Sequence, residues 1–139
     1  MVLFFCTLVV TFLGAAEEHQ FLGKHFIASY LECDSEALQN VEKLMQVMRE
    51  GARRSGAQAL NDIHHVFPGN GLTMVILLAE SHLSIHTYPE IGACFVDLFT
   101  CGDHCQHGPC DKVLRDYLKP RSVNSKVLTR SEEIHEHAH

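Results

Sequence analysis

Apolar and polar positions alternate along this chain with two different periods. Stretches rich in aromatic and β-branched residues predict strands at residues 25–31, 58–67, 72–79, 82–87, 93–100 and 122–128. Other apolar residues recur at spacings of three and four, the pattern of an amphipathic helix: Leu38, Val41, Leu44, Met45, Met48 and Ala52. Asp34 and Ser35 offer N-cap oxygens for this helix, Gly56 ends it, and residues 111–118 predict a second, shorter helix.

The order of these elements predicts the fold class. Strand-helix-strand-strand is followed by strand-strand-helix-strand, so two similar halves give an α+β fold, a two-layer α/β sandwich with helices on one face of an antiparallel sheet. Residues 72–79 and 93–100 are apolar on both sides of the predicted strands. The sheet face away from the helices therefore needs cover, and we expect a homodimer that packs sheet on sheet.

Bulk composition narrows the class of protein. The 139 residues suffice for one domain, which we place at residues 20–130, but not for two. An apolar content of 46% with 20% charged residues is typical of a globular protein. The net charge of -6 leaves no basic patch, so nucleic acid is not an expected partner.

The two ends of the chain differ from the rest. Residues 1–19 form a hydrophobic extension, and residues 1–16 are similar to the apolar core of a signal peptide. No Lys or Arg precedes that run, and it is shorter than the ~20 residues of a membrane-spanning helix. We expect a cytoplasmic protein, with export or membrane association through residues 1–16 as the alternative. Residues 131–139 are charged and His-rich, which predicts a disordered tail.

Reactive side chains concentrate in two neighbouring segments. Residues 79–90 read Ala-Glu-Ser-His-Leu-Ser-Ile-His-Thr-Tyr-Pro-Glu, and residues 97–102 read Asp-Leu-Phe-Thr-Cys-Gly. Buried polar groups each need a hydrogen-bond partner, so a strand core seldom holds many of them. The number of polar side chains in these predicted strands therefore indicates a functional site. This block resembles the self-cleavage and active-site region of the small bacterial and archaeal type of S-adenosylmethionine decarboxylase proenzyme. The resemblance spans residues 22–130 and is strongest at 80–102.

The resemblance implies a self-processing enzyme with a built-in cofactor. The chain is expected to cut itself between Glu80 and Ser81, giving fragments 1–80 and 81–139 that stay associated. The Ser81 oxygen attacks the preceding carbonyl, an ester forms, and β-elimination turns residue 81 into a pyruvoyl group. That ketone forms a Schiff base with the substrate amine and replaces pyridoxal phosphate. The implied substrate is S-adenosylmethionine, and the product serves spermidine biosynthesis.

The same resemblance assigns roles to other residues. The motif Glu-Ser-His-Leu-Ser-Ile-His points to His86 as the processing base, with His82 as the alternative. In a regular strand, positions 81 and 86 face opposite sides, so we expect the chain to bend near Ser81. Cys101 is expected to return a proton to the substrate, and Thr73 to assist cleavage where relatives often carry serine.

Binding residues follow from the chemistry of the implied substrate. An adenine ring and a sulfonium favour aromatic faces, and ribose hydroxyls pair with a carboxylate. Phe67, Tyr88 and Glu90 are therefore the binding candidates, although relatives often carry tryptophan at position 88. The closest rival function keeps the scaffold but decarboxylates ornithine or arginine. A second rival is a non-catalytic activating partner, which the retained Ser81 disfavours.

A final group of residues could hold a metal ion. His104, Cys105, His107 and Cys110 follow Cys101, and Cys and His are zinc ligands. Their spacing matches no compact zinc module, so we expect no metal and reduced thiols. A metal-binding module and a Cys105–Cys110 disulfide remain the alternatives.

Overall fold

The structure is a computed structural model that describes residues 22–102 and 104–131. The hydrophobic extension and the tail predicted from the sequence lie outside the described residues. Within that part of the chain, the strands are β1 (Leu22–Leu31), β2 (Ala59–Val66), β3 (Leu72–Leu78), β4 (Ser81–Tyr88), β5 (Ala93–Cys101) and β6 (Ser122–Ser131). The helices are α1 (Ser35–Gln39), α2 (Val41–Arg54), α3 (His107–Leu118) and the short 3₁₀ helix η1 (Pro89–Ile91).

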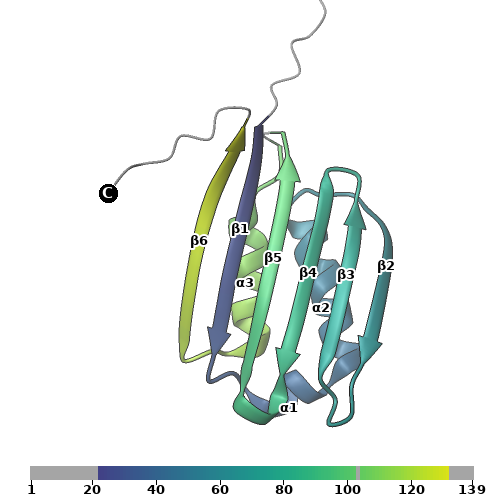
Figure 1. Ribbon diagram of the computed structural model, residues 1–139, viewed down its shortest axis with the longest axis vertical. Helices are drawn as coiled ribbons and strands as arrows, with labels where there is room; N and C mark the ends of the chain where they lie inside the picture. Colours follow the sequence, from purple (N-terminus) through teal and green to yellow (C-terminus); the bar gives the residue numbers. More distant parts are fainter. Residues whose placement is uncertain (1–21, 103, 132–139) are drawn as a thin grey trace, which may run out of the picture.

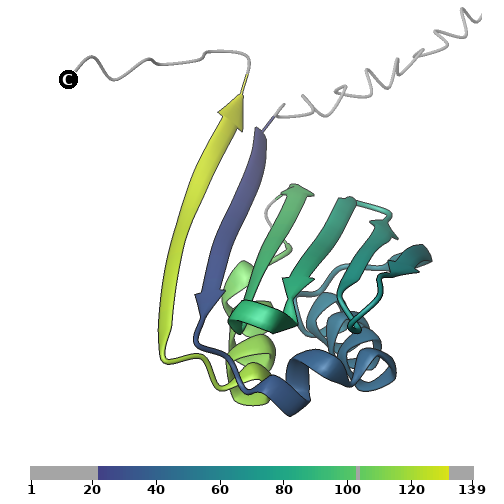
Figure 2. The same ribbon diagram turned by 60° about the horizontal axis from the view of Figure 1, so that its bottom comes forward.

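The strands form one antiparallel sheet in the order β2-β3-β4-β5-β1-β6 (Figure 1). The helices lie on one side of that sheet (Figure 2). Alternate strand residues point into the layer between sheet and helices and are almost fully buried: Phe26, Tyr30, Met74, Ile76, Leu83, Ile85, Val96 and Leu98. Leu44, Met48, Leu114 and Leu118 meet them from α2 and α3. This arrangement confirms the predicted two-layer α/β sandwich.

The first helical segment differs from the prediction. The apolar periodicity predicts one helix, but the structure has α1 and α2, separated at Asn40. The Asn40 side chain accepts a hydrogen bond from the Lys43 N–H at 3.1 Å and caps α2, while Asp34 caps α1 through the Ala37 N–H at 2.9 Å. The first N–H groups of a helix have no partner within that helix. The Asn40 side chain supplies a partner for one of them, which favours the start of a new helix at this position.

The second half also extends further than predicted. Helix α3 begins at His107, although Gly108 and Pro109 read as helix breakers in the sequence. Proline fits there because the N–H groups of a first helical turn have no intrahelical partner to lose. Strand β6 runs on to Ser131 because it pairs with β1 over the whole length of that strand.

A buried hydrogen bond ties the sheet to α3. The Tyr30 hydroxyl, on a fully buried side chain, donates to Asp111 Oδ1 at 2.7 Å. Burial and this carboxylate hold the pKa of Tyr30 far above its ordinary value, so the phenol stays a donor. The bond links β1 to α3 across the buried core.

The second face of the sheet, here called the open face, is formed by strand residues that point away from the helices. It exposes several large apolar side chains: Ile63, Val75, Leu77, Phe95 and Leu128. Such a surface supports the expectation of sheet-on-sheet dimerisation, which stays a prediction. Across the described residues, we find no helix with the length and apolar character needed to traverse a bilayer.

Candidate active site

The predicted cleavage point lies at the corner of a tight hairpin. Leu78 at the end of β3 pairs with Ser81 at the start of β4, so Ala79 and Glu80 form the turn. Ser81 has a φ of 158°, at the margin of the positive region that residues with a Cβ rarely adopt. Ser81 is nevertheless the first residue of β4 and pairs with Leu78 and Thr100, so the predicted bend is limited to the hairpin corner.

Hydrogen bonds hold both ends of the Glu80 residue. Its main-chain carbonyl accepts from the Cys101 N–H at 3.2 Å, which brings the predicted proton donor beside the predicted scissile bond. Its carboxylate accepts from the Gln58 N–H at 3.0 Å and lies 3.2 Å from His104 Nε2. Burial alone raises the pKa of the Glu80 carboxyl, but these hydrogen bonds outweigh burial and leave that pKa below its usual range.

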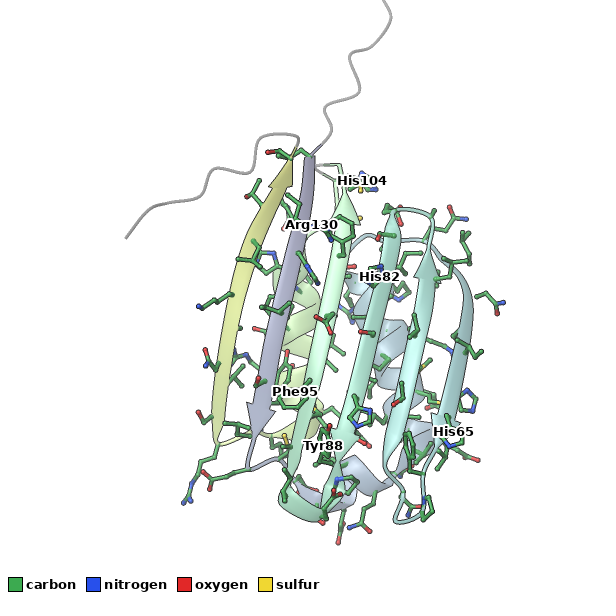
Figure 3. The ribbon with its side chains drawn as sticks, viewed as in Figure 1. His65, His82, Tyr88, Phe95, His104 and Arg130 are labelled. Atoms are coloured by element: carbon green, nitrogen blue, oxygen red, sulfur yellow. The ribbon has the colours of Figure 1, made fainter. Side chains whose placement is uncertain are left out.

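The Ser81 hydroxyl contacts an imidazole, but it is that of His82. Ser81 Oγ lies 3.1 Å from His82 Nδ1. Figure 3 shows His82 on the open face. Its ring lies against that of Phe99, with the two ring centroids 5.8 Å apart. The Arg130 guanidinium lies over the same Phe99 ring, 4.5 Å from its centroid. The ring also packs against Gly23, where the Cβ of any other residue would collide with it. We call Glu80, Ser81, His82 and Cys101 the Ser81 group.

A second group gathers at the other end of β4. His86 Nδ1 lies 2.5 Å from Thr73 Oγ1, which is the residue predicted to assist cleavage. Aromatic rings flank this histidine, with centroid distances of 5.8 Å to Phe67 and 4.5 Å to Tyr88. We call Phe67, Thr73, His86 and Tyr88 the Tyr88 group. The cluster therefore combines the predicted processing base, the predicted cleavage helper and two predicted binding residues.

The two groups are separated along β4. Positions 81 and 86 lie in one extended strand, and at ~3.3 Å per residue their Cα atoms are about 16 Å apart. Figure 3 shows the same separation, with Tyr88 and His82 toward opposite ends of the strand. Within one copy, the structure does not bring His86 to Ser81. Glu90 follows Tyr88 in η1, and its side chain is exposed to solvent.

Several open-face residues were missed by the sequence analysis. His25 lies beside the Ser81 group, with its ring against Phe99, and its buried Nε2 lies 3.5 Å from Asp97 Oδ1 without a hydrogen bond. The alternation of residues 25–31 places His25 on one strand face. What the sequence could not reveal is that β1 inserts between β5 and β6 and so carries His25 to this site.

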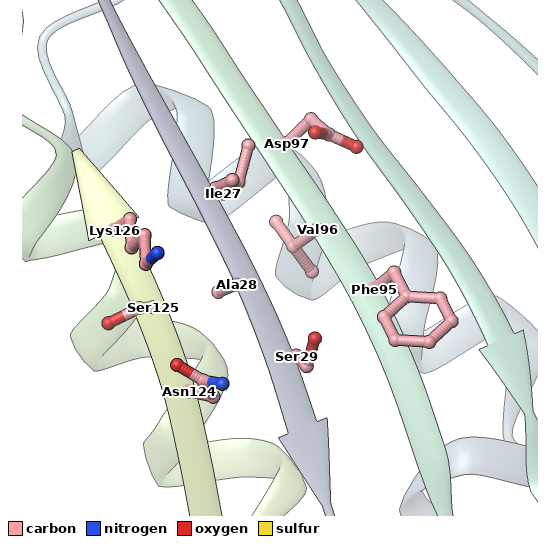
Figure 4. A pocket seen from close by; sticks show the side chains of 9 residues that line it. All are labelled: Ile27, Ala28, Ser29, Phe95, Val96, Asp97, Asn124, Ser125 and Lys126. Carbon is pink, nitrogen blue, oxygen red and sulfur yellow. The ribbon is translucent and has the colours of Figure 1, made fainter. Parts of the chain in front are cut away.

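A hollow of about 350 Å³ lies over β5, β1 and β6 (Figure 4). Its open-face lining combines opposite charges with polar and apolar groups: Ile27, Ser29, Phe95, Asp97, Asn124 and Lys126. Phe95 also touches Tyr88, with ring centroids 5.7 Å apart, so the hollow continues the Tyr88 group.

The Cys and His residues after position 101 do not act as one cluster. His107 stacks on Phe26 with centroids 5.3 Å apart, and the Cys110 sulfur packs against Gly51 between α2 and α3. Burial raises the pKa of the Cys110 thiol to about 12. Cys110 belongs to the core and His107 is half-buried against it, while His104 and Cys105 lie near Glu80.

Comparison with known proteins relates this chain to one family. The sequence profile described as S-adenosylmethionine decarboxylase matches residues 24–131. The chain belongs to the S-adenosylmethionine decarboxylase family. An S-adenosylmethionine decarboxylase proenzyme of Thermosipho africanus is 44% identical over 103 residues, which cover 74% of this chain and 79% of that protein. One from Methanococcus aeolicus is 41% identical over 99 residues, covering 71% and 85%.

A solved structure shares the architecture. The crystal structure of the adenosylmethionine decarboxylase from Aquifex aeolicus superposes with a TM-score of 0.75 at 28% sequence identity. The match covers 86% of this chain and 99% of that one. Both the family resemblance drawn from residues 80–102 and the predicted fold are confirmed.

Proposed function

We propose that this chain is the precursor of a pyruvoyl-dependent decarboxylase that acts on S-adenosylmethionine. Family membership supports the activity, and one observation carries the processing step. The Glu80 carbonyl is held by the Cys101 N–H at a hairpin corner, and the Ser81 hydroxyl next to it contacts an imidazole. A nucleophile and an electrophile thus meet at one peptide bond, with an imidazole beside the hydroxyl.

The chemistry follows from that arrangement. The Ser81 oxygen adds to the Glu80 carbonyl carbon, whose oxygen the Cys101 N–H stabilises as it gains charge. The peptide C–N bond breaks as the ester forms, and an imidazole carries the hydroxyl proton to the departing nitrogen. Loss of the α-proton of residue 81 then expels the Glu80 carboxylate and ends the first fragment at that residue. The dehydroalanine left at residue 81 shifts to its imine form, which water hydrolyses with release of ammonia to leave a pyruvoyl group. That group supplies a ketone that binds an amine and accepts electrons as carbon dioxide leaves.

Two histidines compete for the role of processing base, and distance separates them. His82 reaches Ser81 within its own chain at 3.1 Å. His86 is about 16 Å away along β4 and can act only from a second copy. Sheets packed face to face lie about 10 Å apart, so side chains of one can reach the other. A two-fold axis lying across the strands would place the partner's His86 over Ser81.

The same dimer would complete the substrate site. Cys101 lies beside residue 81, where it can return a proton to the substrate carbon that has lost carbon dioxide. The aromatic faces of Phe67 and Tyr88 suit an adenine ring and a sulfonium, and Glu90 suits ribose hydroxyls. These binding residues would come from the partner subunit together with its His86. The open face then holds two equivalent sites per dimer.

Parallel assays of carbon dioxide release test this function. Purified, cleaved protein is given carboxyl-labelled S-adenosylmethionine, ornithine and arginine under identical conditions. We expect release from S-adenosylmethionine alone. Turnover of either amino acid without S-adenosylmethionine would establish the rival substrate. A fully cleaved protein that turns over none of the three would favour a non-catalytic partner.

A further inference from the structure

Three metal-ligand side chains converge beside the predicted cleavage point. One donor atom from each of Glu80, His104 and Cys105 lies within 4.8 Å of the other two. The Cys105 side chain is almost fully buried, and that of Glu80 is 13% exposed, whereas His104 is 60% exposed. The cluster therefore has a buried floor and one side open to solvent.

The spacing suits a small tetrahedral ion. Zinc bonds of about 2.0–2.3 Å to oxygen, nitrogen and sulfur place neighbouring ligand atoms roughly 3.3–3.8 Å apart in a tetrahedron. Glu80 Oε1 and His104 Nε2 already lie 3.2 Å apart. The Cys105 sulfur completes the triangle after a shift of about 1 Å, which a rotation about its side-chain bond provides.

The surrounding backbone holds these residues in place. The Gln58 N–H fixes the second oxygen of Glu80 at 3.0 Å and leaves Oε1 for another partner. The segment that carries the other two ligands is fastened to the end of α2 by the Gln106 N–H, which donates to the Ser55 carbonyl at 2.9 Å.

We propose that Glu80, His104 and Cys105 form a binding site for a zinc-class divalent ion. A carboxylate, an imidazole and a thiolate are a borderline-soft donor set that favours zinc over magnesium or calcium. The fourth position faces solvent on the His104 side. This assignment replaces the expectation of no metal and leaves His107 and Cys110 out of the site.

The site has a consequence for the processed protein. Glu80 ends fragment 1–80, whereas His104 and Cys105 belong to fragment 81–139. A bound ion would therefore join the two fragments at the point where the chain has been cut. This consequence rests on the proposed self-cleavage, but metal binding itself does not.

Cobalt(II) provides a direct test, because a thiolate bound to cobalt gives a charge-transfer absorption that histidine or carboxylate ligands do not. The full-length protein is reduced, freed of metal and titrated with cobalt chloride and then with zinc chloride. We expect the thiolate band to saturate at one cobalt per chain and to vanish when zinc displaces it. The tail at residues 132–139 contains His135, His137 and His139 but no cysteine, so it cannot produce this band.

Matched variants identify which cysteine gives the cobalt–thiolate band. Cys105→Ala should abolish it, and His104→Ala should weaken zinc binding at least about tenfold, the lower end for losing even a supporting group. Cys101→Ala and His107→Ala should keep both the band and the affinity. Each variant is checked for native thermal unfolding without metal. A wild-type protein without the band, or a band that survives Cys105→Ala, would overturn the proposal.

Discussion

The two ends of strand β4 differ in how their residues are held. At the Ser81 end, the main chain positions the groups, through a tight turn and the hydrogen bond from the Cys101 N–H to the Glu80 carbonyl. At the Tyr88 end, side chains position one another, as His86 lies between aromatic rings and against Thr73. Backbone fixation suits a reaction of the main chain, and an aromatic cluster suits recognition of a flat, cationic ligand.

This separation is the reason why the proposed site draws on two copies of the chain. Ser81 and the binding candidate Tyr88 stand at opposite ends of one strand, roughly 23 Å apart at ~3.3 Å per residue, too far for one small substrate to contact both. The open face that carries both ends also exposes large apolar side chains. Substitutions at the two ends should therefore fail in different ways, in chemistry at one end and in binding or assembly at the other.

The processing base gives the largest expected effect. If His86 acts across the dimer, His86→Ala should slow cleavage by ~100- to 10,000-fold, the usual contribution of a general base. His82→Ala should slow it much less. Gel electrophoresis of freshly translated protein over time measures both rates.

Mixed dimers then separate the two copies. Co-expression of His86→Ala with Ser81→Ala should restore cleavage of the His86→Ala chain, because the Ser81→Ala chain still supplies the histidine. Normal cleavage of His86→Ala alone, with loss in His82→Ala, would place the base within the chain.

Cys101 should separate processing from turnover. Cys101→Ala keeps the backbone N–H that binds the Glu80 carbonyl, so fragments 1–80 and 81–139 should still form. Decarboxylation should fall by ~100-fold or more, since the proton donor is lost. Densitometry of the fragments and carbon dioxide release are measured on the same sample. Full activity in this variant would place the donor elsewhere.

The open face should govern assembly. Leu77 is 53% exposed on β3, and Leu77→Lys would place an unpaired charge in a sheet-on-sheet interface. We expect the dimer dissociation constant to rise at least about 100-fold, since such a charge costs several kcal/mol. Sedimentation analysis measures it. Ile91→Lys is the control, because Ile91 is 70% exposed in η1, off the sheet. Equal dissociation constants for both variants would place the interface elsewhere.

The Tyr88 group should show the smallest change. Tyr88→Ala removes an aromatic face worth about 0.5–2 kcal/mol toward a cation, so KM for S-adenosylmethionine should rise about 2- to 30-fold. Tyr88→Trp keeps the face and should keep KM near the wild-type value. Steady-state kinetics on fully cleaved protein measure this. An unchanged KM in Tyr88→Ala would remove Tyr88 from the binding site.

Local sequence patterns predicted most of the fold. Each strand was expected close to where it occurs, because alternation reports which residues face the core. Asn40 broke the expected helix because its capping role outweighs the apolar repeat around it. The predicted helix began at residue 111, whereas α3 begins at His107, because Pro109 fits the first helical turn, where its missing N–H costs no hydrogen bond.

The candidate site was predicted in its members but not in its geometry. Motif resemblance named Ser81, His86 and Cys101, yet nothing local reveals that strand pairing brings only Cys101 to Ser81. Gly23 pairs with Cys101 on β5 and with Arg130 on β6. This pairing of distant residues brings Gly23 and Arg130 to the Phe99 ring. Long-range strand order, rather than local propensity, fixes these contacts.

Intact mass spectrometry of freshly purified protein tests the central claim most directly. The account predicts two species, matching residues 1–80 and 81–139, with the second blocked to Edman degradation because its first residue is a pyruvoyl group. Ser81→Ala should give one uncut chain without activity. A wild-type chain that stays uncut and still decarboxylates S-adenosylmethionine would contradict the account.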